Sequence, residues 1–471
     1  MVSRQTMYKW MLVLALPLWA VGAEQKEGIE LKTLVLVPAG EPSPVLGIRL
    51  MPRPSELKSG NAALFYNAAL GFQPKIEEDA ENQLEQWRDQ AVDQWPRPEV
   101  QKLLDSFAHT LRYIRLGTHC RNCDWELPLE DGFDLVMPPL GDFRRMAKLM
   151  TLRTRMAIAD GQVDQAVASV QDGLVMGMNM DEGPLLVQSL VGMAIARVTL
   201  DELEHWCQTP GMPNLYWALT ALPRPLVTAR KAYDYEYDML LNTFPGLRDI
   251  DTVILTAAQA QRLAQDIMFK AGSLDNTPQP RALDTLAPTA WVMIQYRDAK
   301  AWLRKQGWSQ ERIEAMPAAQ AVLIYQLRQY RQLYEEGLKN FFLPYNQGCP
   351  LLKQVEEDFN RHYSQGLKTN LFVMYLPALY RVNEIEAWLA RDIAMQRVIE
   401  ALRWYAADHE RQLPHSLNQI TVVPVPPDPV TGKAFVYRCN DGVKARLEAP
   451  LYTERETRRP VFALTVRQLS K

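Results

Sequence analysis

The chain has 471 residues, of which 47% are hydrophobic and 23% charged, and its formal net charge at pH 7 is −3. These values are typical of a globular protein, and they exclude a disordered chain and the strongly basic character expected of a nucleic-acid-binding protein. The length suits two or three domains or one large helical array.

The N-terminus has the pattern of an export signal. Arg4 and Lys9 come before the apolar run WMLVLALPLWA, and no acidic residue comes before Glu24. Ala23 is a small residue of the kind that precedes the cleavage site of a signal peptide. The run is too short to span a bilayer comfortably. We therefore expect residues 1–23 to be a signal peptide cleaved after Ala23, which leaves a periplasmic or secreted protein that is not an integral membrane protein. An uncleaved anchor is the alternative.

Residues 24–60 are rich in proline and predict an extended N-terminal segment or linker, in which IELKTLVLVP favours an edge strand. From residue 61 to 410 the chain is a succession of amphipathic helical patterns ended by prolines, which predicts one α-helical domain. We expect a mainly α fold, an irregular bundle or array of αα-hairpins. Its later helices are expected at 225–243, 251–272, 287–306, 317–342, 350–363 and 380–409.

The clearest helical unit is a hairpin near the middle of the chain. Asp142 suits the start of a first helix that ends near Ala159, and Gly161 stands where a helix C-cap favours positive φ. The second helix has its apolar residues at helical spacing from residue 163 to 174. The helix that follows is apolar nearly all round, which predicts a place in the middle of a bundle, and Gly192 favours close approach of a neighbouring backbone.

The pattern changes after residue 410. AFVYR, VKARLEA and PVFALTV predict strands, and Gly432 and Gly442 each follow a polar residue as in a tight turn. Residues 411–471 are therefore expected to form a small C-terminal α/β module with an antiparallel sheet.

Part of the chain resembles a known family. The Cys-Asp-Trp run at 123–125, the Asp-Gly pair at 131–132 and the helical hairpin after them are similar to a family of uncharacterised exported bacterial α-helical proteins. GNAALFYNAALGF near residue 60 looks like that family's first helix. Pro139 stands where the family usually has a histidine, which argues against a catalytic role for this position. The resemblance implies an exported helical fold and no particular activity.

A second segment is similar to the C-terminal module of type II secretion pseudopilins. It comprises the helix that ends ALRWYAADHE, a Leu-Pro-x-Ser-Leu turn and the pattern DPVTGKAFVY. The resemblance implies a portable helix-plus-sheet module, and in some pseudopilins the loop near this aspartate binds calcium. Here Asp428 and Asp441 alone offer side-chain oxygens, fewer than the 6–8 ligands that calcium takes. We expect a structural turn and no metal.

Cys120 and Cys123, in THCRNCDWELPLEDG, are the closest pair of cysteines. A structural zinc site needs four ligands, and Cys207, Cys349 and Cys439 supply no second pair at close spacing. A thioredoxin-type centre needs a helix N-terminus, whereas the residues after this pair have the composition of a loop. In an oxidising compartment the expected state is a Cys120–Cys123 disulfide. Pairing with a distant cysteine and free thiols are the alternatives.

Two further patterns contain residues that could bind a metal or a ligand. Glu202-x-x-His205 is half of a carboxylate-bridged di-iron motif, but the motif occurs once, so we expect solvated helix surface.

In KAYDYEYDMLLN, Tyr233 and Tyr237 share one helical face, and Asp234 and Asp238 share another. This arrangement predicts a ledge that binds a sugar or peptide. A helix with one packed and one wet side is the alternative.

The sequence contains no G-x-S-x-G, H-E-x-x-H, P-loop or Rossmann fingerprint, so we expect no cofactor. The function we expect is binding of proteins or peptides, or scaffolding, in the cell envelope. The partners are then envelope proteins or peptides and not nucleic acid, and enzymatic activity is not expected. An envelope hydrolase is the alternative, with an acidic site between helices that uses residues such as Glu130, Asp131, Asp181 or Asp234.

Overall fold

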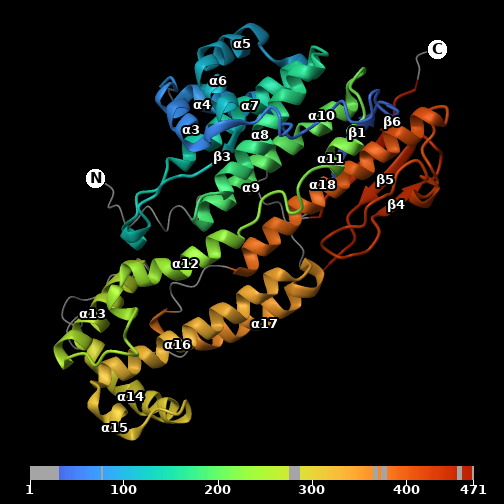
Figure 1. Cartoon of the computed structure of the whole chain (residues 1–471). Coiled ribbons are helices and arrows are strands. Elements are labelled where there is room, and N and C mark those ends of the chain that lie inside the picture. The colour runs from blue at the N-terminus through green and yellow to red at the C-terminus, as the bar shows by residue number, and fades with distance from the viewer. Residues whose placement is uncertain are drawn as a thin grey trace. The chain divides into compact units, whose positions relative to one another are not determined.

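The computed structural model describes residues 31–75, 78–274, 287–363, 370–372, 379–452 and 459–468. The predicted signal peptide, residues 1–23, lies outside these residues. The described chain is mostly helical with one small sheet at its C-terminal end, which confirms the predicted fold class (Figure 1). No helix within the described ranges is both long and apolar enough to cross a membrane.

The chain divides into two compact units. Of the described residues, unit 1 holds Leu127–Val136 and Tyr233–Glu384, and unit 2 holds all the others. This division differs from the predicted single helical domain over 61–410. The helices are shared between the units, and the C-terminal module belongs to unit 2.

The predicted hairpin forms the middle of unit 2. It consists of α7 (Leu140–Ala159) and α8 (Val163–Asp181), joined at Gly161, whose φ is 68°. Helix α9 (Leu186–Asp201) packs on α8 so closely that a Cβ added to Gly177 would lie 2.7 Å from the carbonyl oxygen of Gly192. The prediction that Gly192 allows a close helix approach is therefore confirmed.

Shorter elements pack around this hairpin in unit 2. Helix α6 contacts both α3 and α8, and α5 contacts α6 and α7. Strands β2 and β3 form a two-stranded parallel ladder beside α3. The bounds of these elements are α3 (Ala62–Gly71), α4 (Glu78–Asp89), α5 (Arg97–Ser106), α6 (Ala108–Thr118), α10 (Leu203–Gln208), α11 (Tyr216–Thr220), β2 (Lys58–Asn61) and β3 (Cys120–Asn122).

A four-stranded sheet completes unit 2, with the order β1-β6-β5-β4. The predicted C-terminal strands are β4 (Val436–Cys439), β5 (Lys444–Glu448) and β6 (Val461–Val466), and neighbours among them are antiparallel. The edge strand expected near residue 30 is β1 (Leu31–Leu36), which pairs in parallel with β6. A segment of the predicted linker is thus part of the sheet.

The long helix α18 (Leu379–Asp408) lies along this sheet (Figure 1). Val398 and Leu402 of the helix share one hydrophobic core with Leu34 of β1 and Leu464 of β6. The sheet is therefore covered on one face by a helix, as the sequence predicts for the C-terminal module.

Unit 1 is built around α16 (Ala318–Leu338), in which Tyr330 and Tyr334 are buried. The loop before α13 is held by the amide of Gln320 in α16, which donates to the carbonyl oxygens of Ile250 (2.7 Å) and Val253 (2.6 Å). The helices of this unit are α12 (Arg230–Thr243, from residue 233 on), α13 (Ala257–Leu274), α14 (Ala287–Lys305), α15 (Gln310–Ala315), α16 (Ala318–Leu338) and α17 (Tyr345–Tyr363).

Candidate functional site

The tyrosine ledge predicted on α12 is not a surface feature. Tyr233 is fully buried, and its ring lies 4.5 Å from that of Phe341. Tyr237 is half-buried and stacks on Tyr330, with 6.1 Å between the ring centroids. Asp234 and Asp238 are exposed. The helix therefore has one buried side and one side exposed to solvent, which is the alternative given in the sequence analysis. Its acidic side chains and its aromatic rings do not form a common surface.

The predicted Cys120–Cys123 disulfide is not formed, because all five cysteines are free. Cys120 begins the extended strand β3, and Cα atoms three strand residues apart are separated by about 10 Å, whereas a disulfide needs less than about 7 Å. The thiol of Cys120 donates to the carbonyl oxygen of Leu116 and that of Cys123 to Asn179, each at 3.4 Å. Burial raises the pKa of Cys123 to about 12.

The Cys-Asp-Trp run instead serves packing. Trp125 is buried and stacks on Tyr66, with ring centroids 6.0 Å apart, while Phe143 meets its edge. The indole N–H donates to the carbonyl oxygen of Asn179 at 2.9 Å. These contacts hold the segment after β3 against α3, α7 and α8 without a disulfide.

The acids proposed for a hydrolase are divided between the two units. Glu130, Asp131 and Asp234 are exposed residues of unit 1, whereas Asp181 belongs to unit 2.

Glu202 and His205 are not solvated helix surface. Glu202 is 2% exposed, and it accepts hydrogen bonds from Nε (2.9 Å) and Nη2 (2.6 Å) of Arg155. Burial lowers the pKa of His205 to about 4, and the charge of Arg155 lowers it further. Arg155 and Glu202 therefore form a buried ion pair with a structural role, and the His205 ring beside them is neutral near pH 7. The prediction failed because the partner, Arg155, is remote in the sequence.

Asp428 and Asp441 support turns. Asp428 accepts from Nε of Arg391 at 2.9 Å, and Asp441 accepts from the backbone N–H groups of Val443 (2.9 Å) and Lys444 (2.6 Å). Over the ranges that the structure describes, no cluster of three or more His, Cys, Asp or Glu residues could hold a metal ion.

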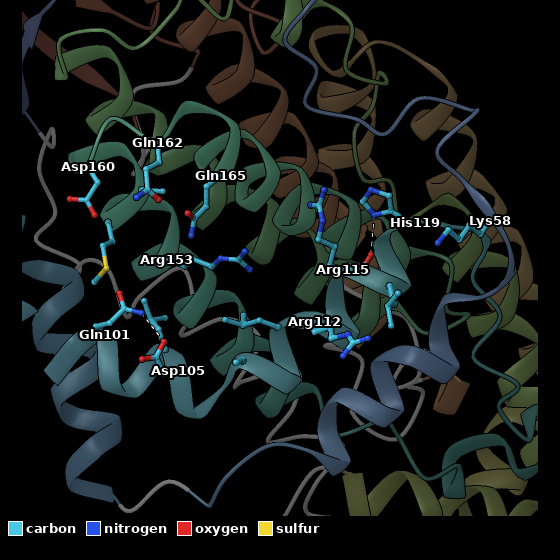
Figure 2. A pocket seen from close by; sticks show the side chains of 16 residues that line it. Lys58, Gln101, Asp105, Arg112, Arg115, His119, Arg153, Asp160, Gln162 and Gln165 are labelled. Carbon is cyan, nitrogen blue, oxygen red and sulfur yellow. Dashed lines mark hydrogen bonds between the residues drawn. The ribbon is translucent and has the colours of Figure 1, made fainter. Parts of the chain in front are cut away.

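A pocket of about 760 Å³ lies in unit 2 between α5, α6 and the α7–α8 hairpin (Figure 2). Its floor is apolar and includes the buried side chains of Leu104, Leu111 and Met156. Its polar lining holds more cations than acids. The charged and imidazole side chains are Lys58, Asp105, Arg112, Arg115, His119, Arg153 and Asp160, and the amides are Gln101, Gln162 and Gln165.

Helical spacing places the cations on the pocket side. Arg112, Arg115 and His119 occupy positions i, i+3 and i+7 of α6 and the residue after it, so they follow one helical face. Arg153 reaches the same space from α7. Figure 2 shows the three arginines near the centre of the pocket, with His119 and Lys58 to one side.

Arg115 is fixed by a buried acid. Its Nη1 donates to both carboxylate oxygens of Asp172, at 3.1 and 3.2 Å, and Thr118 Oγ1 donates to the same carboxylate at 2.7 Å. Burial raises the pKa of Asp172, and Arg115 opposes that shift by favouring the charged form. Nε and Nη2 of Arg115 have no hydrogen-bond partner within the described chain.

His119 is oriented by the helix that precedes it. Its Nδ1 lies 3.0 Å from the carbonyl oxygen of Arg115. A carbonyl oxygen only accepts, so Nδ1 carries the proton in this arrangement. The neutral ring therefore presents Nε2 as an acceptor, and the protonated ring presents it as a donor.

The remaining charges of the pocket are not paired with one another. Among the described residues, Arg112 and Arg153 have no hydrogen bond or ion pair, and Asp105 is bonded to Gln101 Nε2 (2.7 Å) but to no cation. Asp160 forms an ion pair with Arg97 at the rim. The pocket thus holds the guanidinium groups of Arg112 and Arg153 and the carboxylate of Asp105, which form no ion pair with one another, although the charge of Arg153 also acts on Asp172.

Comparison of the chain with protein-family models, curated proteins and solved structures found no match. The support for the candidate site is therefore the geometry described above.

The sequence contains one signal for this pocket, in α6. HTLRYIRLGTH places two arginines and a histidine on one helical face, but such a face is also typical of solvated helix surface. Arg153 lies about forty residues further on in the hairpin, and its convergence with that face depends on tertiary packing.

Proposed function

We propose that this protein is an exported protein- or peptide-binding component of the cell envelope. We place its binding site in the pocket between α5, α6 and the α7–α8 hairpin, where it holds an anionic group of the partner. Export is supported by the signal-like residues 1–23 and by the resemblance of residues 123–204 to exported helical proteins. The partner is an envelope protein or peptide, and the protein acts by binding without catalysis.

The observation that supports binding most strongly is the convergence of Arg112, Arg115 and Arg153 on one pocket. A guanidinium presents its N–H groups as a planar fork that matches a carboxylate, so arginine suits recognition of such groups. Walls of low dielectric strengthen the attraction relative to open water. Because Asp172 already fixes Arg115, part of the site is arranged before any partner arrives.

An envelope hydrolase is the alternative, and one feature favours it. Burial raises the pKa of Asp181 to about 6 and that of Glu386 to about 7, and paired carboxyls of unequal pKa serve as acid and base in hydrolases. The backbone N–H of Thr228 donates to Asp181 (2.9 Å), and that of Ala229 donates to Glu386 (3.4 Å). These bonds support the start of α12, which explains the two acids without catalysis. Binding is therefore the function we put forward.

Met156 offers a direct test, because it lines the pocket. In protein with ¹³C-labelled methionine methyl groups, the Met156 signal can be assigned with Met156→Leu. Titration with acetyl-tetraglutamate amide should shift this signal, and titration with acetyl-tetralysine amide should not. An equal response to both peptides, or no response to tetraglutamate at millimolar concentration, would contradict the proposal.

A matched pair of variants separates the pocket from general charge attraction. Arg112→Gln with Arg153→Gln removes two pocket cations and should weaken tetraglutamate binding at least tenfold. Arg297→Gln with Arg304→Gln makes the same change in charge at two exposed positions of α14 and should leave binding unaltered. Equal weakening by both pairs would mean that the peptide senses only the net charge.

A further inference from the structure

We infer that the pocket takes a short peptide with both ends free, whose carboxylate lies on the arginines and whose ammonium lies on Asp105. This inference rests on the proposed binding function and adds the class and the direction of the ligand. It follows from charged groups of opposite sign that line one pocket and form no ion pair with one another.

The carboxylate end is defined by guanidinium groups with unused donors. Arg112 and Arg153 have no bonded partner in the described chain, and Arg115 keeps Nε and Nη2 available while Nη1 is held by Asp172. Lys58 lies beyond Arg115 and His119, at the end of the pocket away from Asp105 (Figure 2). One carboxylate can accept two parallel N–H bonds from an arginine and still have lone pairs for a second donor.

The ammonium end is defined by Asp105. Its carboxylate accepts from Gln101 and is bonded to no cation in the described chain. Figure 2 shows Asp105 and Asp160 together with the glutamines, away from His119 and Lys58. Asp160 is paired with Arg97, but these side chains are 34% and 47% exposed, so that the pair is weak. A ligand that carries only negative charge leaves Asp105 uncompensated and repels it.

The span of the pocket sets the length of the peptide. Between the two ends its lining follows α6 from Ala108 to Arg115, a distance of about 10 Å along a helix that rises 1.5 Å per residue. An extended peptide advances about 3.3 Å per residue, so three or four residues fit. Gln101, Gln162 and Gln165 offer both donors and acceptors to peptide groups, which suits recognition of a backbone with little preference for its side chains.

The experiment compares tetraalanine in four forms, with each end free or blocked, through the Met156 methyl signal. The free-ended peptide should bind most tightly. Amidation of its C-terminus and acetylation of its N-terminus should each weaken binding at least fivefold. In Asp105→Asn the free-ended peptide should bind as weakly as the acetylated one, and acetylation should then have no further effect, because both changes remove the same interaction. Asp164→Asn, at an exposed position of α8, is the matched control and should retain the full effect of acetylation.

The possible failures are distinguishable. If amidation of the C-terminus weakens binding but acetylation of the N-terminus does not, Asp105 does not bind the ammonium group. The proposed direction of the peptide is then wrong, and the pocket is a site for anions. If free-ended tetraalanine does not bind while tetraglutamate does, the ligand class is wrong and the proposed function stands. If neither peptide binds, both fail. Inorganic phosphate that shifts Met156 and displaces tetraalanine at equal concentration overturns the peptide assignment in favour of a simple anion.

Discussion

Arg391 and Asp428 form a bidentate ion pair that joins α18 to the turn before β4. Nε of Arg391 donates to Oδ1 at 2.9 Å and Nη2 donates to Oδ2 at 3.1 Å, and both side chains are almost completely buried. The same carboxylate accepts from the backbone N–H of Val430 (3.2 Å) and from Oγ1 of Thr431 (2.8 Å). In this turn, for which the sequence predicted a structural role, a guanidinium supplies the positive charge that faces the Asp428 carboxylate.

Removing one partner of this pair should destabilise the protein strongly. Asp428→Asn leaves the Arg391 guanidinium buried without its counter-charge, and such a change costs about 3–5 kcal/mol. Urea unfolding followed by far-UV circular dichroism measures the loss. Arg438→Gln, at an exposed position of β4, is the control and should stay within about 0.5 kcal/mol of the parent. Equal stabilities of the two variants would contradict the role of the pair.

The acids at the start of α12 should make stability depend on pH. Burial raises the pKa of Asp181 to about 6 and of Glu386 to about 7, while carboxyls in an unfolded chain titrate near about 4. Between these values the folded protein binds protons that the unfolded chain does not, so the free energy of unfolding falls as the pH rises from about 4 to 7. His205, whose pKa is lowered to about 4, acts in the opposite direction below its unfolded value.

A comparison of variants isolates the two carboxyls. Asp181→Asn with Glu386→Gln should gain about 4 kcal/mol relative to the parent between pH 5 and pH 7.5, because neither replacement titrates. Urea unfolding at the two pH values measures the difference. Asp238→Asn changes an exposed acid of α12 and should follow the parent. A parallel dependence for the double variant and the parent would show that these carboxyls titrate normally.

The close contact of α8 and α9 should not tolerate a methyl group. Gly177→Ala places its Cβ against the carbonyl oxygen of Gly192, and overpacking of this kind typically costs about 1–3 kcal/mol. Gly141→Ala is a helical control, since a Cβ there meets no atom within 4 Å. It should be neutral or stabilising by up to about 1 kcal/mol. Thermal unfolding of both variants tests the contrast, and similar melting temperatures would contradict it.

Cys120 and Cys123 should be recovered as free thiols. Burial raises the pKa of both, that of Cys123 to about 12, so little reactive thiolate is present at pH 8. Iodoacetamide should therefore modify native Cys123 much more slowly than the unfolded protein. Mass mapping without reduction would refute this if the peptide that contains both cysteines were 2 Da lighter than its reduced form.

Export predicts a defined mature N-terminus. If residues 1–23 are a cleaved signal, protein recovered from the periplasm or the medium begins at Glu24. Edman sequencing or intact mass reads this directly. Recovery of Met1 in the membrane fraction would show instead that the segment is retained as an anchor.

Short sequence patterns predicted the helices, strands and turns, but they did not predict which distant residues contact one another. Gly161 has the positive φ that its place after α7 implied, and Gly442 has a φ of 71° in the turn between β4 and β5. Both features depend on a few neighbouring residues, which a sequence displays. Arg155 and Glu202 show the limit, because nothing in the sequence around Glu202 indicates that an arginine from α7 reaches it.

The candidate site depended wholly on such long-range contacts. The spacing of Arg112 and Arg115 was visible, but a charged helical face has the same pattern whether it meets solvent or a pocket. Tyr233 illustrates the opposite error, since a mixed aromatic and acidic pattern suggested a ledge although its ring is buried. Which face of a helix is covered follows from the packing of the whole unit.

The parallel pairing of β1 with β6 determines how late the sheet of unit 2 can form while the chain is being translated. Leu31 and Val461 are partners in the sheet although about 430 residues separate them, and contacts of such range form late. During translation β1 leaves the ribosome without its neighbour, and its core residues Leu34 and Leu36 lack the strand that they pack beside. The sheet of unit 2 is therefore completed only after the last strand has been made. A chain that crosses a membrane before that point does so without having to dismantle this sheet, and a chain truncated ahead of β6 keeps an unpaired apolar strand that is open to association with other chains.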